Sequence, residues 1–217
     1  MNWKLFRLAP WIDTRARFVH RIRRTGSLLD LGSSDGETLA HIAELRPDLQ
    51  LYAADKGKRP ARPVKCEFAS VDFEVDGLPW PAASMDGITC MHVVEHLKEL
   101  KPLLREVSRL LRPGAAAYFE TPHPKTILLP KASEFGDVPF TLNFYDDTTH
   151  VQPVPVETLS ILAREVGLEP VRSGTSRNWL FASSYPFLRF LPLSRKVFTA
   201  RVHWIGWSAY LIVRRPH

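Results

Sequence analysis

The chain has 217 residues, a length that one ordinary domain can fill. Hydrophobic residues make up 45% and charged residues 24%, and every stretch of eighteen residues carries polar or charged groups, which argues against a membrane-spanning helix. The two cysteines, Cys66 and Cys90, lie in predicted strands and lack the spacing of metal ligands. We therefore expect a reducing compartment and no metal site.

The formal net charge of +6 is concentrated at the two ends of the chain. Residues 1–24 contain one acid, Asp13, and no acidic residue follows Glu169. Such ends favour an anionic partner, either nucleic acid or a membrane surface. The N-terminus lacks the compact apolar core of a secretory signal, and its Arg-rich character leaves a transit peptide as an alternative. We expect it to pack on the domain instead, because it is rich in apolar side chains: Trp3, Leu5, Phe6, Leu8, Trp11 and Ile12.

From Ser27 onward, short apolar runs alternate with segments of helical periodicity, which is typical of βαβ units and a mainly parallel sheet. The apolar runs predict strands over 28–31, 49–55, 66–73, 85–91, 115–120, 168–174 and 209–215. The predicted architecture is a three-layer, doubly wound α/β domain over 27–217. A basic helical extension over 1–26 precedes it, and an aromatic and basic insertion over 177–208 interrupts it before the last strand.

Helices are predicted from apolar residues at helical spacing and from their end signals. The first carries Leu39, Ile42 and Ala43 and stops before Pro47, and Ser34 has capping-box spacing to Glu37 at its start. A second predicted helix runs from Leu97 to Leu111, where Arg-Pro-Gly stops it, and a third opens at Pro155 and closes at Gly167.

The turn after the first strand has the features of a nucleotide site. In open parallel sheets the ligand lies beyond the carboxyl ends of the strands, which places Asp30 and the turn GSSDG at the ligand. Gly32 and Gly36 in this turn allow positive φ and close backbone approach. Asp55 closes the second strand and suits a carboxylate that accepts both hydroxyls of a ribose.

The charge of this turn favours a cationic ligand over a pyrophosphate. A dinucleotide fingerprint needs GxGxxG and an anion-friendly helix start. Here Ser34 replaces the middle glycine, and Asp35 and Glu37 would repel phosphate by about 3 to 4 kcal/mol before screening. S-adenosylmethionine, with its ammonium and sulfonium, fits better. The alternative is that these residues only cap the following helix.

These motifs in order resemble the class I S-adenosylmethionine-dependent methyltransferases, especially their type 11 and type 23 group. The likeness covers residues 27–121, through LLDLGSSDG, Asp55, Asp72 with Phe73, and MHVVEHL, and it continues more weakly to Gly174. It implies S-adenosylmethionine as the cofactor and a sheet of seven strands with the last strand antiparallel. It places Asp72 and Phe73 beside the adenine and the carbonyl of Met91 or His92 on the methionine amino group. The predicted cofactor residues are Asp30, Gly32, Ser34, Gly36, Asp55, Asp72, Phe73, Met91 and His92. The chain departs from the family at Ser34 and at Lys56, where an apolar residue often covers the adenine.

The sulfonium is already an activated methyl donor, so positioning can supply about 7 to 11 kcal/mol and no enzyme nucleophile is needed. A base would add about 10² to 10⁴ in rate. Histidines near the carboxyl edge of the sheet are the candidates. We expect His150 first, with Asp146 or Asp147 as an orienting carboxylate, because FYDDTTHVQP resembles an acceptor-facing pattern of related sugar and lipid methyltransferases. His92 is the second candidate, His123 is a further one, and His96 is expected to be structural.

The aromatic and basic ends leave three interpretations open: a lid over a hydrophobic acceptor, a contact with an anionic membrane, and packing by a terminal helical layer. We expect O-methylation of a small-molecule, sugar or lipid-linked acceptor, in the cytoplasm or peripherally at the inner membrane face. One alternative is a non-catalytic module that binds a membrane surface or an anionic polymer. The other is an RNA methyltransferase, although MHVV lacks the Pro-Pro-aromatic signature of amino-group methylation, so nucleic acid is not the expected acceptor.

Overall fold

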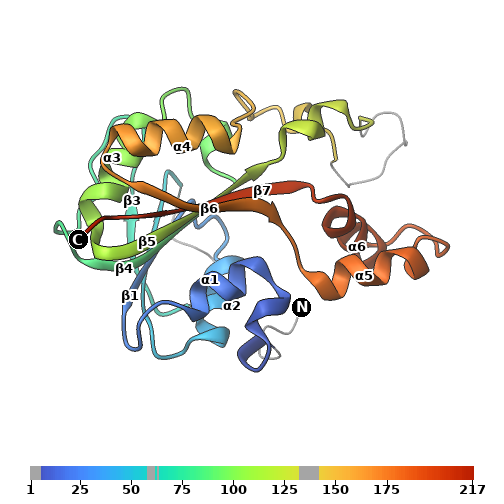
Figure 1. Ribbon diagram of the computed structural model, residues 1–217, viewed down its shortest axis with the longest axis horizontal. Helices are drawn as coiled ribbons and strands as arrows, with labels where there is room; N and C mark the ends of the chain where they lie inside the picture. The colour runs from blue at the N-terminus through green and yellow to red at the C-terminus, as the bar shows by residue number, and fades with distance from the viewer. Residues whose placement is uncertain (1–5, 58–61, 63, 132–141) are drawn as a thin grey trace.

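The computed structural model describes residues 6–57, 62, 64–131 and 142–217. A seven-stranded sheet with the order β3-β2-β1-β4-β5-β7-β6 runs through its middle (Figure 1). β7 is antiparallel to β5 and β6, whereas the neighbours from β3 to β5 are parallel. The predicted sheet, with its antiparallel last strand, is confirmed. The strands are β1 Ser27–Leu31, β2 Gln50–Asp55, β3 Glu67–Ser70, β4 Met85–Met91, β5 Leu111–Pro122, β6 Glu169–Ser176 and β7 Ser208–Arg214.

Helices cover both faces of the sheet, which confirms the three-layer architecture. α1 (Thr14–His20) and α2 (Glu37–Leu45) lie on one face, and α3 (Lys101–Leu110) and α4 (Val156–Glu165) lie on the other (Figure 1). Each face has its own apolar cluster. Leu103, Leu104 and Leu159 pack in one cluster, and Phe18 and Ile42 pack in the other.

Residues 6–26 pack against the domain and contribute side chains to the apolar cluster that contains Phe18 and Ile42. Phe6, Ala16 and Val19 are almost fully buried there, beside Tyr118 of β5. The predicted basic helical extension is observed as a 3-10 turn over Pro10–Ile12 and as α1. Trp3 and Leu5 lie outside the described residues.

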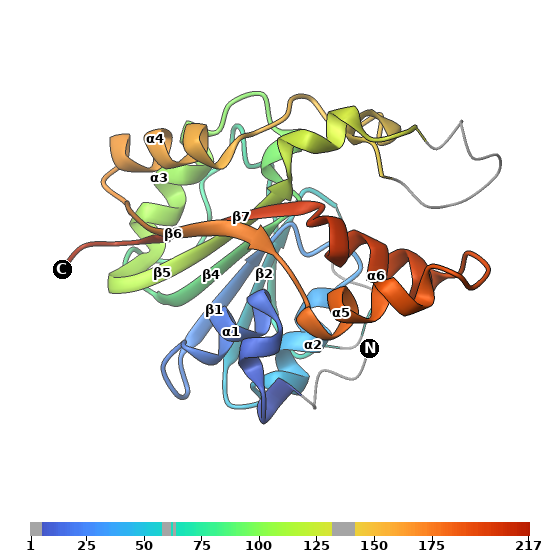
Figure 2. The same cartoon turned by 45° about the vertical axis from the view of Figure 1, so that its right-hand side comes forward.

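The predicted insertion over 177–208 lies at the carboxyl edge of the parallel strands. β6 ends there, and its chain continues into α5 (Trp179–Leu188) and α6 (Arg195–Ile205), which return to β7. These two helices form a hairpin that projects from the body of the domain (Figures 1 and 2). Among the described residues, no helix is both long and apolar enough to cross a bilayer.

Several predicted boundaries are wrong. The third strand ends at Ser70, because the Asp72 side chain accepts the N–H of Glu74 and bends the chain into a turn. The helix predicted from Leu97 begins at Lys101, where Pro102 occupies the first turn. The predicted stop at 112–114 belongs to β5, which begins at Leu111.

The start of α2 differs from the predicted capping box. Gly36, with φ of 83°, occupies the N-cap position, so Ser34 lies outside the helix. The N–H of Glu37 donates to Asp35 Oδ1 at 3.0 Å. Asp35 therefore caps the first turn, and Ser34 is exposed before the helix begins.

Candidate functional site

A pocket of about 340 Å³ opens at the carboxyl ends of β1, β2 and β4. It contains most of the predicted cofactor residues, whereas Asp30, Gly36 and Met91 are not among the residues that line it. The lining residues are Gly32, Ser34, Asp55, Lys56, Asp72, Phe73, Glu74, His92, Val93, His96 and Leu97. Segments far apart in the sequence are thus brought to one edge of the sheet, as parallel topology requires.

The glycine turn after β1, residues 32–36, contacts the segment after β4 on one side and β2 on the other. Gly32 has φ of +77°, and a Cβ at this position would lie 2.2 Å from Val93 Cγ2, so only glycine fits between the turn and the segment after β4. The N–H of Ser34 donates to Asp55 Oδ2 at 2.8 Å. The turn is therefore fixed against β2 and against the residues after β4, which preorganises the pocket wall.

Two carboxylates face the outer part of the pocket. Asp55 accepts the N–H of Gly57 as well as that of Ser34, which fixes the direction of its side chain. Lys56 Nζ lies 2.7 Å from Asp72 Oδ2, and this hydrogen bond holds the pKa of the Asp72 carboxyl below its usual value. The Lys56 side chain is 77% exposed, so it can move aside when a ligand enters.

Asp30 lies behind the glycine turn and is buried. Its Oδ1 accepts a hydrogen bond from Thr89 Oγ1 at 2.7 Å, and its Oδ2 has no partner within the described part of the chain. Burial, together with the negative charge of Asp55, raises the pKa of Asp30 to about 7 despite the Thr89 hydrogen bond. A buried carboxyl of this kind favours a cationic group beside it.

A larger cavity, of about 540 Å³, lies at the opposite edge of the sheet. Arg23, Asp86 and Arg112 line it, at the amino ends of the parallel strands. Ligands of open α/β sheets bind at the carboxyl edge, and the Asp86 carboxylate is already paired with both arginines. We therefore assign the functional site to the smaller pocket.

A buried charged network lies beneath the pocket. Arg15 of α1 donates to both oxygens of Glu120, at 2.9 and 2.5 Å, and the Tyr118 hydroxyl donates to Glu120 Oε2 at 2.6 Å. The His92 ring lies between two glutamates, with Nδ1 3.0 Å from Glu95 Oε1 and Nε2 3.4 Å from Glu120 Oε1. The network links α1 to the pocket wall.

The two glutamates set the charge of His92. Burial alone would lower the pKa of this imidazole, but its hydrogen bonds to Glu120 and Glu95 raise the pKa to about 9. Burial would likewise raise the pKa of Glu120, but Arg15 and His92 hold it well below its usual value. His92 is therefore an imidazolium at neutral pH, which can donate hydrogen bonds but has no lone pair for accepting a proton.

His150 has the opposite arrangement. Its Nδ1 lies 2.6 Å from the carbonyl oxygen of Phe144, which requires a proton on Nδ1, so the neutral form of the ring has its lone pair on Nε2. Nε2 is 3.8 Å from Asp147 Oδ2, too far for a hydrogen bond. A backbone carbonyl, rather than Asp146 or Asp147, thus orients the ring. Asp146 instead accepts the N–H of Asn143.

His150 is not among the residues that line the pocket, but its ring contacts His96, which is. Their ring centroids are 4.8 Å apart, and His96, in the 3-10 turn Val94–His96, lines the pocket. His96 Nδ1 also lies 3.0 Å from Thr149 Oγ1, which ties the two histidine segments together. His123 is not brought to this cluster, because its Nδ1 accepts the N–H of Lys125 and caps another 3-10 turn.

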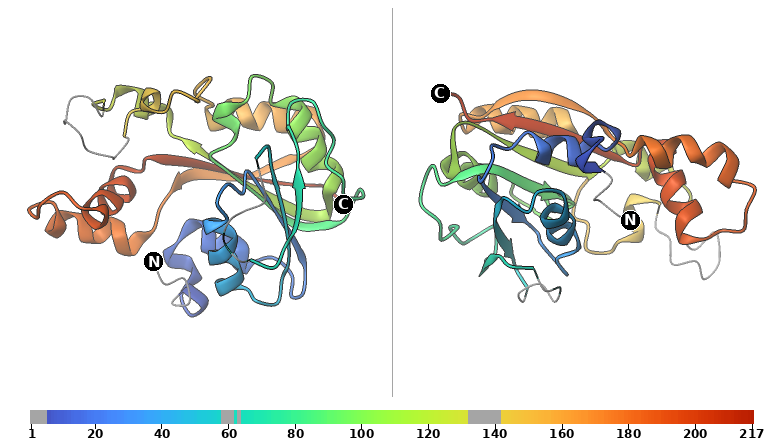
Figure 3. Two further views of the ribbon diagram at one scale, coloured as in Figure 1. Left: turned by 180° about the vertical axis from the view of Figure 1, so that it is seen from behind. Right: turned by 90° about the horizontal axis from the view of Figure 1, so that it is seen from below.

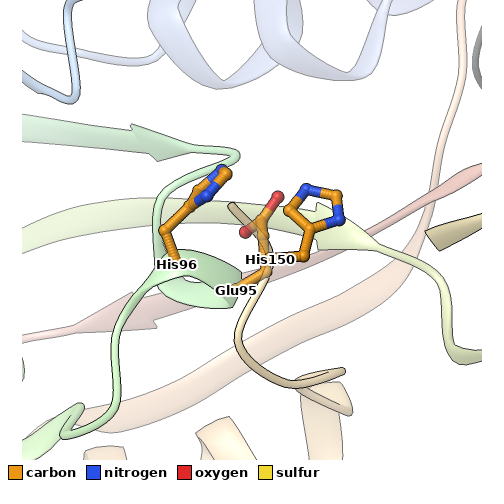
Figure 4. A group of neighbouring side chains, drawn as sticks. All are labelled: Glu95, His96 and His150. Carbon is orange, nitrogen blue, oxygen red and sulfur yellow. The ribbon is translucent and has the colours of Figure 1, made fainter. Parts of the chain in front are cut away.

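Glu95, His96 and His150 form a cluster of potential metal ligands that the sequence does not predict. One ligand atom each of Glu95, His96 and His150 lies within 4.8 Å of the others, and Figure 4 shows the carboxylate between the two rings. Glu95 Oε2 is buried and has no hydrogen-bond partner among the described residues. Residues of these types could hold a divalent cation. In the sequence this group is visible only as two separate dipeptides, Glu95-His96 and Thr149-His150, and nothing there indicates that they lie close together in the fold.

Comparison with known proteins decides the family. The family model described as "Methyltransferase domain" matches residues 3–173, which is most of the chain. The chain belongs to this family, and it is an S-adenosylmethionine-dependent methyltransferase of class I. The resemblance inferred from the motifs is thereby confirmed.

The relatives of this methyltransferase have various functions. It is 28% identical over 170 residues to a ubiquinone biosynthesis O-methyltransferase of Thiobacillus denitrificans, covering 73% of the chain and 69% of the relative. It is 31% identical over 88 residues to methyltransferase str2 of Strobilurus tenacellus, covering 40% of the chain but only 32% of that relative. A solved S-adenosylmethionine-dependent methyltransferase from Archaeoglobus fulgidus has the same fold, with a TM-score of 0.61 at 18% identity, covering 98% and 94% of the two chains.

The pocket of the methyltransferase fits this cofactor. It offers the half-buried Asp55 carboxylate, which could accept ribose hydroxyls, and the apolar Phe73, which could pack on a base. The unpartnered oxygen of Asp30 lies behind the same wall and favours positive charge. When bound, S-adenosylmethionine supplies a methyl group on a positively charged sulfur.

Replacing Asp30 with asparagine should make the methyltransferase more stable at neutral pH. The unfolded carboxyl loses its proton near 3.8 and the folded one near 7, so the wild-type free energy of unfolding falls as pH rises between these values. The Asp30→Asn variant cannot ionise there, and its advantage should reach about 3 to 4 kcal/mol above pH 7. Urea unfolding at about pH 4 and about pH 8 measures it, and an equal difference at both pH values would contradict the buried-acid interpretation.

Proposed function

We propose that this methyltransferase transfers a methyl group to an oxygen of a small-molecule, sugar or lipid-linked acceptor. The supporting observation is the group of histidines at the mouth of the pocket, where a hydroxyl proton can be removed: His92 and His96 line the pocket, and the His150 ring contacts that of His96 at an angle of 55°. The name of the Thiobacillus relative, an O-methyltransferase, points to the same acceptor atom.

In this proposal the residues that line the pocket hold the adenosyl part of the cofactor. Asp55 accepts the two ribose hydroxyls, and Asp72 and Phe73 lie beside the adenine. The backbone carbonyl of Met91 or His92 receives the methionine ammonium, and the positive φ of His92, 56°, turns the chain at this point. Asp30, behind Gly32, adds negative charge on the same side. The donor would thus be held by groups that are already fixed by the sheet.

His150 is the proposed base. Its tautomer leaves Nε2 with the lone pair, and its side chain is only 6% exposed, so the ring is shielded from bulk water. His92 contributes differently in this proposal: Glu95 and Glu120 take up both N–H groups of its imidazolium, so the ring acts through its positive charge, which favours the negative charge that develops on the acceptor oxygen. The second catalytic residue of the sequence analysis is thus retained as a positive charge beside the acceptor and not as a base.

His150→Ala should lower kcat by about 10² to 10⁴, because the acceptor hydroxyl then loses its proton to water. An acceptor is first found by screening metabolites with labelled S-adenosylmethionine. The pH dependence of kcat is then compared for the wild type and the variant, in EDTA so that a cation at Glu95 does not contribute. His123→Ala is the matched control, since His123 lies in another turn. Full turnover with an unchanged pH profile in His150→Ala would remove His150 from the mechanism.

The other functional interpretations remain alternatives. A non-catalytic binding module would lack affinity for S-adenosylhomocysteine in calorimetry. RNA methylation is supported only by the positive charge of the two ends. A cytoplasmic site of action, suggested by the sequence positions of Cys66 and Cys90, stays a prediction, as does the division of the chain at residue 26.

A further inference from the structure

The hairpin of α5 and α6 ends in an exposed apolar tip, residues 187–196, which we call the hairpin tip. Phe187 is 80% exposed and Phe190 76% exposed, and Leu191 and Leu193 are at least half exposed. The tip projects from the body of the domain in every view (Figures 1, 2 and 3). Large apolar side chains gathered on one projecting element indicate an interaction surface.

The hairpin tip carries cations and no acids. Arg189, Arg195 and Lys196 are all exposed, and the sequence has no acidic residue after Glu169. The Arg189 guanidinium lies 4.8 Å from the centre of the Phe190 ring, so charge and aromatic surface are adjacent. Aromatic side chains that enter the acyl boundary, with cations at the headgroups, are the pattern of a peripheral contact with anionic lipid.

The base of the hairpin is fixed to the domain. Arg177 Nη1 donates to the carbonyl oxygens of His203 and Trp204 at 2.5 and 2.6 Å, and Asn178 Nδ2 donates to Asp13 Oδ2 at 3.0 Å. A Cβ on Gly206, which ends α6, would lie 2.3 Å from Thr175 Cγ2. The tip is therefore presented by an anchored support, which lowers the entropy lost on docking.

The hairpin itself buries little of its apolar surface. In α5 the buried residue is Ala182, and in α6 the buried residues are Val197 and Ala200. Trp179 and Leu180, at the start of α5, are each 58% exposed. A helix that is apolar on most sides needs a second apolar environment beyond its own packing.

From these observations we propose that the hairpin tip docks on the surface of an anionic lipid bilayer. A projecting basic tip fits a deformable lipid surface, whereas a stable protein interface of standard size buries about 800 Å² on each partner. The hairpin leaves the sheet at its carboxyl edge, the same edge at which the pocket opens, so docking brings the methyl-transfer site close to the membrane. The docking does not depend on the identity of the acceptor.

Flotation with vesicles tests the proposal on the full chain. The wild type should float with phosphatidylcholine vesicles that contain phosphatidylglycerol, and much less with phosphatidylcholine alone or in high salt. Phe187→Ser/Phe190→Ser should lower the partition coefficient at least about tenfold, because two large apolar side chains no longer enter the lipid. Ile161→Ser/Val171→Ser is the matched control: these residues are 57% and 53% exposed on α4 and β6, away from the hairpin, and their replacement should leave flotation unchanged.

Circular dichroism and calorimetry with S-adenosylhomocysteine separate docking from folding and from methyl transfer, since both variants should keep wild-type spectra and affinity. Failure of the wild type to float with anionic vesicles, or equal flotation of the two double variants, overturns the proposal. Analytical sedimentation tests a different occupant of the tip. If the wild type does not bind vesicles but forms a dimer, and Phe187→Ser/Phe190→Ser dissociates that dimer, the tip docks on a second copy of the chain and the proposal is wrong.

Discussion

Glu120→Gln should lower the free energy of unfolding by about 3 kcal/mol, because Arg15 then keeps its charge without the carboxylate beside it and His92 loses one of the two glutamates that hold its proton. The value lies at the low end for a broken buried pair since the Arg15 side chain is 33% exposed. Urea unfolding at neutral pH measures the change.

Glu169→Gln is the matched control for this loss. Its carboxylate also pairs with an arginine, Arg214, at 2.7 Å, but both side chains are about half exposed. An exposed pair contributes less than about 1 kcal/mol. If both variants lost the same small amount, the network beneath the pocket would not be the structural support described here.

The second large effect is expected at Asp55. Asp55→Ala should weaken the binding of S-adenosylhomocysteine at least about 100-fold, since two hydrogen bonds from ribose hydroxyls to a carboxylate are each worth about 1.5 to 3 kcal/mol. The variant also frees the N–H groups of Ser34 and Gly57, which loosens the glycine turn. Isothermal titration calorimetry gives the dissociation constant.

Two further variants separate these contributions. Asp55→Asn keeps an oxygen for the Ser34 N–H and should fall between the wild type and Asp55→Ala. Asp35→Asn removes a charge from the same turn, but Asp35 points to the start of α2 and is not among the pocket residues, so its affinity should stay close to wild type. Equal affinities for the Asp35 and Asp55 variants would mean that net charge alone attracts the ligand.

The sequence predicted those parts of the fold and of the pocket that follow from short apolar strands and from parallel topology. β1, β2 and β4 are short apolar runs whose ends carry polar residues, and parallel topology alone brings Gly32 and Asp55 together. The ends of helices and strands were harder to predict than the elements themselves. Leu97 and Leu100 have helical spacing and are buried in the core, yet both lie in the irregular segment that precedes α3.

Contacts between distant residues were beyond sequence reasoning. Arg15 and Glu120 are 105 positions apart, and neither has a neighbour in sequence that predicts its partner. The sequence alone suggests that His92 is a base. The structure places it between Glu95 and Glu120, two residues that the sequence does not connect to it, and there its imidazole carries a positive charge. The orientation of His150 by the Phe144 carbonyl was hidden in the same way, because a backbone oxygen leaves no signal in the sequence.

A crystal structure of the protein grown with S-adenosylhomocysteine tests the central claim most directly. We predict the ribose on the Asp55 carboxylate, the adenine against Phe73, and the sulfur directed toward the histidines at the mouth. Density for the product elsewhere, for instance in the cavity beside Asp86 and Arg112, or a pocket that stays closed by Lys56 at saturating product, would contradict the assignment of this edge of the sheet.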